Sequence, residues 1–320
     1  MAEGKGSVHH PQVSPTAPFV TGPVSVGAQT VLYHTGYDEV RRSAASLARS
    51  AELGMASGAL TSVAFHLGDS SSLPCLSDAE VASLQEEFGR VLKVTYRSFG
   101  ANRGSAGGQN DLAAINAADL LFIQNPDVIA SPRMLETLIE PLKTAGVGIA
   151  EAKQLPVEHP KDYDPKTGET SWAMGACLLI PARLFKSING FDADSFFMYC
   201  DDVDLSWRTK LAGFKVIHHP AAVVFHDKRL SADAKWMPSA AERYYSAEAA
   251  LFMAHKWSKA GVLQRLLEQF SLSPHEDHQK AYSVFMSRRE ADQLPAPLDP
   301  GHEVGQFVGD MYAHHRFALL

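Results

Sequence analysis

Apolar and amphipathic segments alternate along the first half of the chain. Short runs rich in β-branched and aromatic residues have the pattern of buried strands, at 30–35, 60–71, 91–98 and 119–128, the second of which ends in a polar loop. Each run is followed by a segment with apolar residues at helical spacing, at 38–53, 78–91, 107–118 and 131–146. This alternation predicts an α/β fold with a mostly parallel, doubly wound sheet flanked by helices.

The pattern changes after about residue 150. A turn-rich loop and several short strands lead to His226, the spacing becomes helical from about 236, and a Pro-rich irregular tail begins near 290. The first residues of the chain show neither period. The sequence therefore predicts an extended or flexible lead-in over 1–27, an α/β domain over 28–230, and a C-terminal helical extension with an irregular tail over 231–320.

Three polar loops follow the predicted strands closely. Their sequences are "GDSS", "NRGSAGGQN" and "QNPD". Ligands of doubly wound sheets bind outside the carboxyl ends of the strands. The three loops therefore predict a binding site on one edge of the sheet.

Composition and charge narrow the classes of function. The chain has 320 residues and a formal net charge of −7, so no global basic field attracts nucleic acid. Its three cysteines lack a CxxC spacing, which fits a reducing cytosol. No apolar run reaches the roughly 18 residues of a membrane span, and no secretory signal is visible. We expect a cytoplasmic protein that meets any lipid substrate at the inner face of the membrane.

The stretch "FFMYCDDVDLSWR" places carboxylates directly behind an aromatic run. One interpretation is a helix start, in which Asp201 or Asp202 caps the first turn. In the other, one carboxylate is a general base at the edge of an apolar pocket, where partial burial raises its pKa. Both interpretations can hold for different aspartates, and Asp204 is interpreted as a structural partner of Arg208, one turn on.

The run "LLFIQNPDV" carries Asn125 and Asp127 to the end of a predicted strand. A carboxylate there can bind a divalent cation through oxygen, as Mg²⁺ and Mn²⁺ prefer. The alternative is a turn aspartate that follows Pro126. His226 ends the run "VVFH", and a single histidine after an apolar strand is more often structural than a ligand.

Taken together and in order, the motifs resemble those of a known family. They are "ANRGSAGGQN", "LLFIQNPDV", "WAMGACLLIPARLFKSINGFDADSFFMYCDDVDLSWR" and "VVFH". Over residues 30 to about 230 the chain resembles the family 2 glycosyltransferases, and within them the rhamnosyltransferase-like bacterial group. The resemblance implies the Rossmann-like GT-A fold and an inverting transfer that depends on a divalent metal, Mn²⁺ or Mg²⁺. It implies a UDP- or dTDP-sugar donor and a glycan or lipid-linked acceptor of bacterial polysaccharide synthesis.

The resemblance also implies a role for particular residues. Asp202 matches the catalytic base, with Asp201 as the alternate, because the family usually has Glu-Asp where this chain has Asp-Asp. Asp127 and His226 match residues that hold the metal or diphosphate. Positions that meet the nucleotide and donor are Thr35, Asp69, Asn102, Gly104 and Asn125. Positions in the wall of the acceptor pocket are Trp172, Gly175 and Ala176.

Two other functions remain open on the sequence alone. A nucleotidyltransferase would open with a Gly-rich phosphate loop after the first strand, which "HTGYDEVRR" does not match. A non-catalytic nucleotide- or carbohydrate-binding relic would have no need to keep Asp127, Asp202 and His226 together. The transferase is therefore the favoured interpretation.

The C-terminal helical segment also allows two interpretations. Its basic residues near "HKWSKAGVLQRLLEQF" are compatible with a helix lying on a membrane surface. Packing on the catalytic domain, or at a homodimer contact, is favoured because the segment has no dense basic face.

Overall fold

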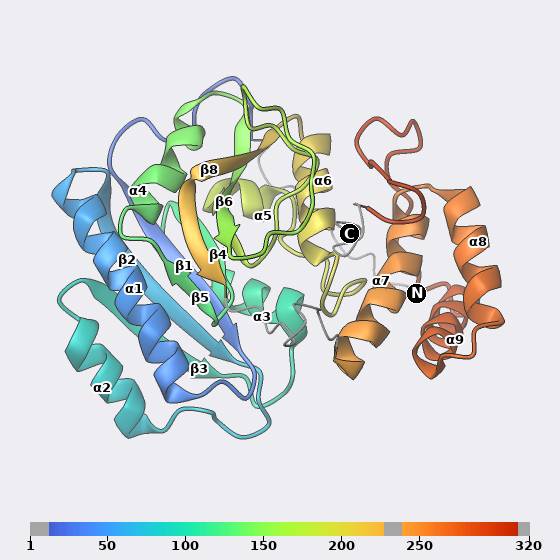
Figure 1. Ribbon diagram of the computed structural model, residues 1–320, viewed down its shortest axis with the longest axis horizontal. Coiled ribbons are helices and arrows are strands. Elements are labelled where there is room, and N and C mark those ends of the chain that lie inside the picture. The colour runs from blue at the N-terminus through green and yellow to red at the C-terminus, as the bar shows by residue number, and fades with distance from the viewer. Residues whose placement is uncertain (1–12, 227–238, 313–320) are drawn as a thin grey trace, which may run out of the picture.

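The computed structural model describes residues 13–226 and 239–312. Its centre is an eight-stranded sheet in the order β3-β2-β1-β4-β7-β6-β8-β5, with helices on both faces (Figure 1). The strands are β1 Val24–Leu32, β2 Leu60–Asp69, β3 Leu92–Ser98, β4 Leu120–Gln124, β5 Val128–Ala130, β6 Val147–Leu155, β7 Cys177–Pro181 and β8 Lys215–His226.

The predicted α/β fold is confirmed, and the sheet is partly antiparallel. The pairs β1–β2, β1–β4, β2–β3 and β6–β8 are parallel. The pairs β4–β7, β6–β7 and β5–β8 are antiparallel. Every residue of β4 and β7 is buried, because helices cover both faces of the sheet. That two-sided cover is why these strands read as continuous apolar runs.

Helices of the first half largely follow the predicted segments. They are α1 Tyr37–Ala56, α2 Asp78–Phe88, α3 Gly104–Ala113 and α4 Met134–Ile139, which a 3₁₀ turn at Glu140–Lys143 extends. The start of α2 is a capping box, in which the Ser77 hydroxyl accepts from the Glu80 N–H and the Glu80 carboxylate accepts from the Ser77 N–H.

Two predicted strands differ from the structure. The first begins at Val24 rather than 30, inside the predicted lead-in, whose residues 1–12 lie outside the described part of the chain. The sequence pattern missed the start of this strand because it contains polar residues. One of them, Gln29, is nevertheless buried and donates to the Gln109 carbonyl oxygen. The predicted strand over 119–128 is two strands, since the chain turns at Asn125, whose carbonyl accepts from the Val128 N–H at 3.3 Å.

The aromatic–acidic stretch forms a turn followed by a helix. Tyr199 and Cys200 have φ angles of 66° and 58°, and α6 Asp201–Leu211 begins directly after them. The preceding helix, α5 Ala182–Ser187, follows β7. The N-cap residue of α6 is Cys200, whose side chain makes no capping hydrogen bond.

The C-terminal helices pack on one another, and the end of α7 contacts α6 (Figure 1). They are α7 Ala240–Lys256, α8 Ala260–Ser271 and α9 Glu276–Glu290. Trp207 of α6 meets Trp257 edge to face, with ring centroids 5.0 Å apart. The structure thus supports packing on the α/β part. In the part of the chain that it describes, no helix is both long and apolar enough to cross a membrane.

Candidate active site

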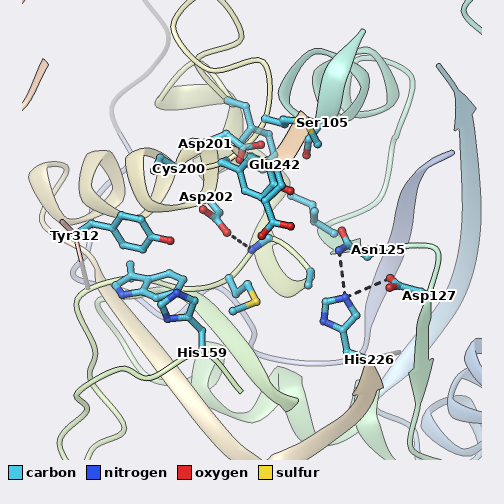
Figure 2. Close-up of a pocket in the computed structure, with 18 of the residues that line it drawn as sticks. Ser105, Asn125, Asp127, His159, Cys200, Asp201, Asp202, His226, Glu242 and Tyr312 are labelled. Atoms are coloured by element: carbon cyan, nitrogen blue, oxygen red, sulfur yellow. Dashed lines mark hydrogen bonds and ion pairs between the residues drawn. The ribbon is translucent and has the colours of Figure 1, made fainter. Parts of the chain in front are cut away.

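A pocket of about 550 Å³ opens beside the carboxyl ends of β4 and β8 (Figure 2). It brings together eight of the residues that the sequence singles out: Asn125, Asp127, Trp172, Gly175, Ala176, Asp201, Asp202 and His226. They come from four segments: the turn after β4, the loop before β7, the first turn of α6 and the end of β8. The strand-end loops and the aromatic–acidic stretch therefore form one site.

One end of the pocket holds Asn125, Asp127 and His226. The Nε2 atom of His226 lies 3.3 Å from Asp127 Oδ1 and 3.5 Å from Asn125 Nδ2. The pairing of β5 with β8 sets this geometry, because Val128 stands opposite His226 in the register. On the far side of the ring, His226 Nδ1 is 2.7 Å from Oε1 of the buried Gln154.

This end of the pocket suits a cation. The Gln154 amide oxygen can only accept, so Nδ1 of His226 carries the proton and donates it. In the neutral ring the lone pair of Nε2 then lies between the Asn125 amide and the Asp127 carboxylate, and a cation there would meet both Nε2 and the carboxylate. Among the described residues, no cluster of three or more His, Cys, Asp or Glu could hold a metal. A metal here would therefore take further ligands from its substrate.

The first turn of α6 carries two aspartates with different environments. Asp202 Oδ2 accepts from the Gly175 N–H at 2.7 Å, and its Oδ1 accepts from the Val203 N–H at 2.8 Å. A Cβ at Gly175 would lie 3.3 Å from the Asp202 Cβ, so glycine allows this close approach. Burial raises the pKa of Asp202 above its ordinary value, although these hydrogen bonds oppose the shift.

Asp201 is buried beside Ser105 on α3. Burial and the nearby Asp202 charge raise the pKa of Asp201 to about 7, from an ordinary value of 3.8. The two carboxyls therefore differ in their hydrogen-bond partners, and they can act differently. The structure brings both predicted candidates for the base into the pocket.

The wall opposite α6, which includes Trp172, is supported by a buried ion pair behind it. Trp172 is 3% exposed, and the Lys161 ammonium lies over its ring, 4.0 Å from the centroid. Glu151, fully buried, accepts from Lys161 and from the Met174 N–H. The Lys161 charge and the hydrogen bonds hold the pKa of Glu151 below its ordinary value, although burial alone would raise it. The wall is thus held in place by an internal ion pair.

Four predicted donor residues lie outside this pocket: Thr35, Asp69, Asn102 and Gly104. Asp69 is fully buried, and its carboxylate accepts from the Ser71 and Cys75 N–H groups and from the Tyr96 hydroxyl. Thr35 Oγ1 accepts from the Tyr33 N–H. Any effect of Asp69 on a nucleobase would act through the loop that it organises. A contact of these residues with the nucleotide stays a prediction.

Asn102 and Gly104 shape the start of α3. The Asn102 side-chain oxygen accepts from the Gly104 N–H at 3.0 Å. Gly104 has a φ of 65°, and a Cβ there would lie 2.2 Å from the Phe197 carbonyl oxygen, so the position requires glycine. The glycine-rich loop is therefore packed against the aromatic stretch that precedes α6.

Sequence reasoning missed several lining residues, among them His159, Glu242 and Tyr312. Figure 2 shows Glu242 between the two α6 aspartates and Asn125. The spacing of Ser239 and Glu242 signals a helix start, and the Ser239 hydroxyl accepts from the Glu242 N–H. Nothing in the local pattern indicates that this helix end reaches the pocket, since the contact depends on tertiary packing.

No family model matches the chain. It is 38% identical over 65 residues to the N-acetylglucosaminyl-diphospho-decaprenol L-rhamnosyltransferase of Mycobacterium tuberculosis, a match that covers 20% of this chain and 21% of the relative. It is 36% identical over 67 residues to rhamnosyltransferase WbbL of Escherichia coli, covering 21% and 25%. The chain thus matches about a fifth to a quarter of the length of these curated relatives. The predicted resemblance to rhamnosyltransferases is confirmed.

Solved structures share the fold across most of the chain. The mannosyltransferase PcManGT from Pyrobaculum calidifontis, in complex with GDP-Man and Mn²⁺, is 13% identical with a TM-score of 0.53, covering 89% of this chain and 80% of that one. GalNAc-T7 with UDP, GalNAc and Mn²⁺ is 13% identical with a TM-score of 0.61, covering 86% and 56%. These likenesses confirm the predicted GT-A fold.

Proposed function

We propose that the protein is an inverting, metal-dependent glycosyltransferase that moves a sugar from a UDP- or dTDP-sugar to a hydroxyl of a glycan or lipid-linked acceptor. One observation carries the proposal: Asp202, a carboxylate with a raised pKa, lies in the same pocket as the Asp127–His226 pair. The partial match to enzymes named as rhamnosyltransferases supports the same reaction class.

In this reaction Asp202 acts as the general base. It takes the proton from the acceptor hydroxyl as that oxygen bonds to the anomeric carbon of the donor sugar. The bond from the anomeric carbon to the diphosphate breaks, and the electron pair leaves with the diphosphate. Attack from the side opposite the leaving group inverts the anomeric configuration. A raised pKa makes Asp202 a stronger base than an exposed aspartate.

Asp127 and His226 would hold the metal, with Gln154 orienting the imidazole. When bound, such a metal neutralises the negative charge that develops on the departing diphosphate. Asn125 contributes an amide next to the same position, at 3.5 Å from the His226 ring. Without a cation, the carboxylates that line the pocket would repel a diphosphate.

The Gly175 N–H fixes where the base points. Its hydrogen bond to Asp202 Oδ2 ties the acceptor wall to α6 and holds one carboxylate oxygen in place. A base works only within hydrogen-bond reach of the proton that it removes. The backbone of the wall therefore acts as a positioning element for catalysis.

The test is calorimetric binding of a panel of nucleotides and nucleotide sugars, with and without Mn²⁺ or Mg²⁺. We expect binding of UDP or dTDP that depends on the metal and that Asp127→Ala abolishes. Asp202→Asn should keep nucleotide binding but lower kcat for transfer by about 10²–10⁴-fold. Asp78→Ala, an exposed acid at the start of α2, is the matched control and should behave as wild type.

Other results of the same panel would point elsewhere. If no nucleotide binds under any metal condition, the protein has the fold without the activity, and a carbohydrate-binding relic becomes the better proposal. If Asp202→Asn retains full transfer while Asp201→Asn loses it, the base is Asp201.

A further inference from the structure

The end of the pocket away from Asp127 is lined by aromatic side chains. The rings of His159 and Trp172 have centroids 5.2 Å apart, and Tyr312 lies edge-on to Trp172 at 5.2 Å. His159 and Tyr312 are 6.0 Å apart. Figure 2 shows Asp202 between this group and the Asp127–His226 pair. The three rings therefore lie on the side of Asp202 that faces away from the Asp127–His226 pair, which is the proposed donor end of the pocket.

Tyr312 reaches the pocket from the last described segment of the chain, which is anchored along its length. Asp310 pairs with Arg265 of α8, and the backbones of Val308 and Met311 pair within the segment. Further back, Phe307 packs on Trp207, with ring centroids 5.5 Å apart. In Figure 2 the Tyr312 hydroxyl points into the pocket, toward Asp202. The segment thus presents a held aromatic ring with a hydroxyl at its tip.

Charge limits what can occupy the pocket. The described lining residues include four carboxylic acids, Asp127, Asp201, Asp202 and Glu242, and none of those lining residues is Lys or Arg. Carboxylates accept hydrogen bonds from hydroxyls and repel anions. Aromatic rings pack against the C–H face of a sugar, while a few polar groups fix its orientation.

We propose that Tyr312, backed by His159 and Trp172, forms an acceptor subsite that takes an uncharged sugar ring, with a hydroxyl of that sugar directed at Asp202. The subsite rests on the proposed transferase function, because it assigns the acceptor half of the same pocket. The geometry follows from the reaction: the attacking hydroxyl lies between the donor carbon and the base, so the rest of the acceptor extends past Asp202. The C-terminal segment thereby becomes part of substrate recognition.

The test measures sugar binding directly, without donor or metal, by saturation-transfer NMR. The probes are methyl glycosides of glucose, mannose, rhamnose and N-acetylglucosamine, and methyl glucuronide as the acidic counterpart of the glucoside. We expect at least one neutral glycoside to bind wild type, and Tyr312→Ala to weaken it by about tenfold or more. Tyr312→Phe keeps the ring and should lose less affinity for the glycoside than Tyr312→Ala does. Tyr163→Ala removes another tyrosine that packs on a histidine, outside this pocket, and should have no effect.

Each outcome decides the proposal. Equal binding of glucoside and glucuronide would overturn the uncharged class, and binding that Tyr312→Ala leaves unchanged would overturn the subsite. Absence of binding by every neutral glycoside would also overturn it. Nucleotide binding measured in parallel separates the two proposals. If the protein binds nucleotide but binds no glycoside in a way that depends on Tyr312, the subsite alone is refuted. If it binds a glycoside in a way that depends on Tyr312 but binds no nucleotide, the transferase function alone is refuted.

Discussion

The three aspartates of α6 perform three different tasks within one helical turn. Asp202 faces the pocket and meets the Gly175 N–H, while Asp201 lies buried beside Ser105. Asp204, fully buried, accepts from the Arg208 Nε–H at 2.7 Å, which confirms the pairing expected from their spacing. The N-cap residue of this helix is Cys200, so neither Asp201 nor Asp202 occupies the capping position predicted for one of them.

Asp201 should make stability depend on pH. Its pKa of about 7 in the folded protein exceeds the ordinary 3.8, so the folded state keeps a proton that the unfolded chain has lost. The stabilisation from this proton is complete below about pH 4 and is lost as pH rises through about 7. In Asp201→Asn, the free energy of unfolding in urea should fall less between about pH 5 and pH 8 than in wild type.

Asp194→Asn, which changes an exposed acid on the loop before α6, is the control and should follow the wild-type pH dependence. An Asp201→Asn variant whose stability falls as steeply as that of wild type over the same pH range would show that Asp201 does not keep its proton in the folded protein.

At the scale of elements, α6 is fixed by the end of α7. The Lys256 ammonium lies 2.7 Å from Asp204 and 2.6 Å from Asp192, and the Trp257 Nε1–H donates to Asp204 at 3.2 Å. Burial would raise the pKa of Asp192, but the Lys256 charge holds it below its ordinary value. The helix that carries the proposed base is thus anchored by a buried cation from the C-terminal segment.

Lys256→Met should destabilise the protein strongly. It removes the counter-charge of Asp192 and leaves the buried Asp204 with Arg208 as its remaining cation. We expect a loss of about 3–5 kcal/mol in the free energy of unfolding. Lys280→Met is the matched control, since Lys280 is exposed and loses only a contact with the Tyr244 ring, worth about 0.5–1 kcal/mol. Chemical denaturation measures both. A loss no greater for Lys256→Met than for Lys280→Met would mean that α6 does not depend on this anchor.

For the whole molecule, the sequence predicted what local pattern determines. Apolar runs marked the strands that are buried on both faces, and the strand-end loops marked Asn125 and Asp127. Local pattern could not show that Gln29 would be buried in a central strand, because a hydrogen bond across the fold satisfies its amide. Nor could it place Tyr312 in the pocket, since that contact depends on how a distant segment folds back.

The α/β part and the C-terminal helices should unfold together. Trp172, Phe196 and Trp207 belong to the same hydrophobic cluster as Phe252, Trp257 and Phe285, so the two parts share this core. Calorimetry should give one transition, with equal calorimetric and van't Hoff enthalpies. Tryptophan fluorescence and far-ultraviolet circular dichroism should share one urea midpoint.

Nucleotide and glycoside binding should disappear at that same midpoint, because α7 and the terminal segment supply Glu242 and Tyr312 to the pocket. Two separated transitions, with the helical signal lost first and nucleotide binding retained, would show instead that the pocket forms without the C-terminal segment. The predicted boundary near residue 230 would then separate two folding units rather than divide one.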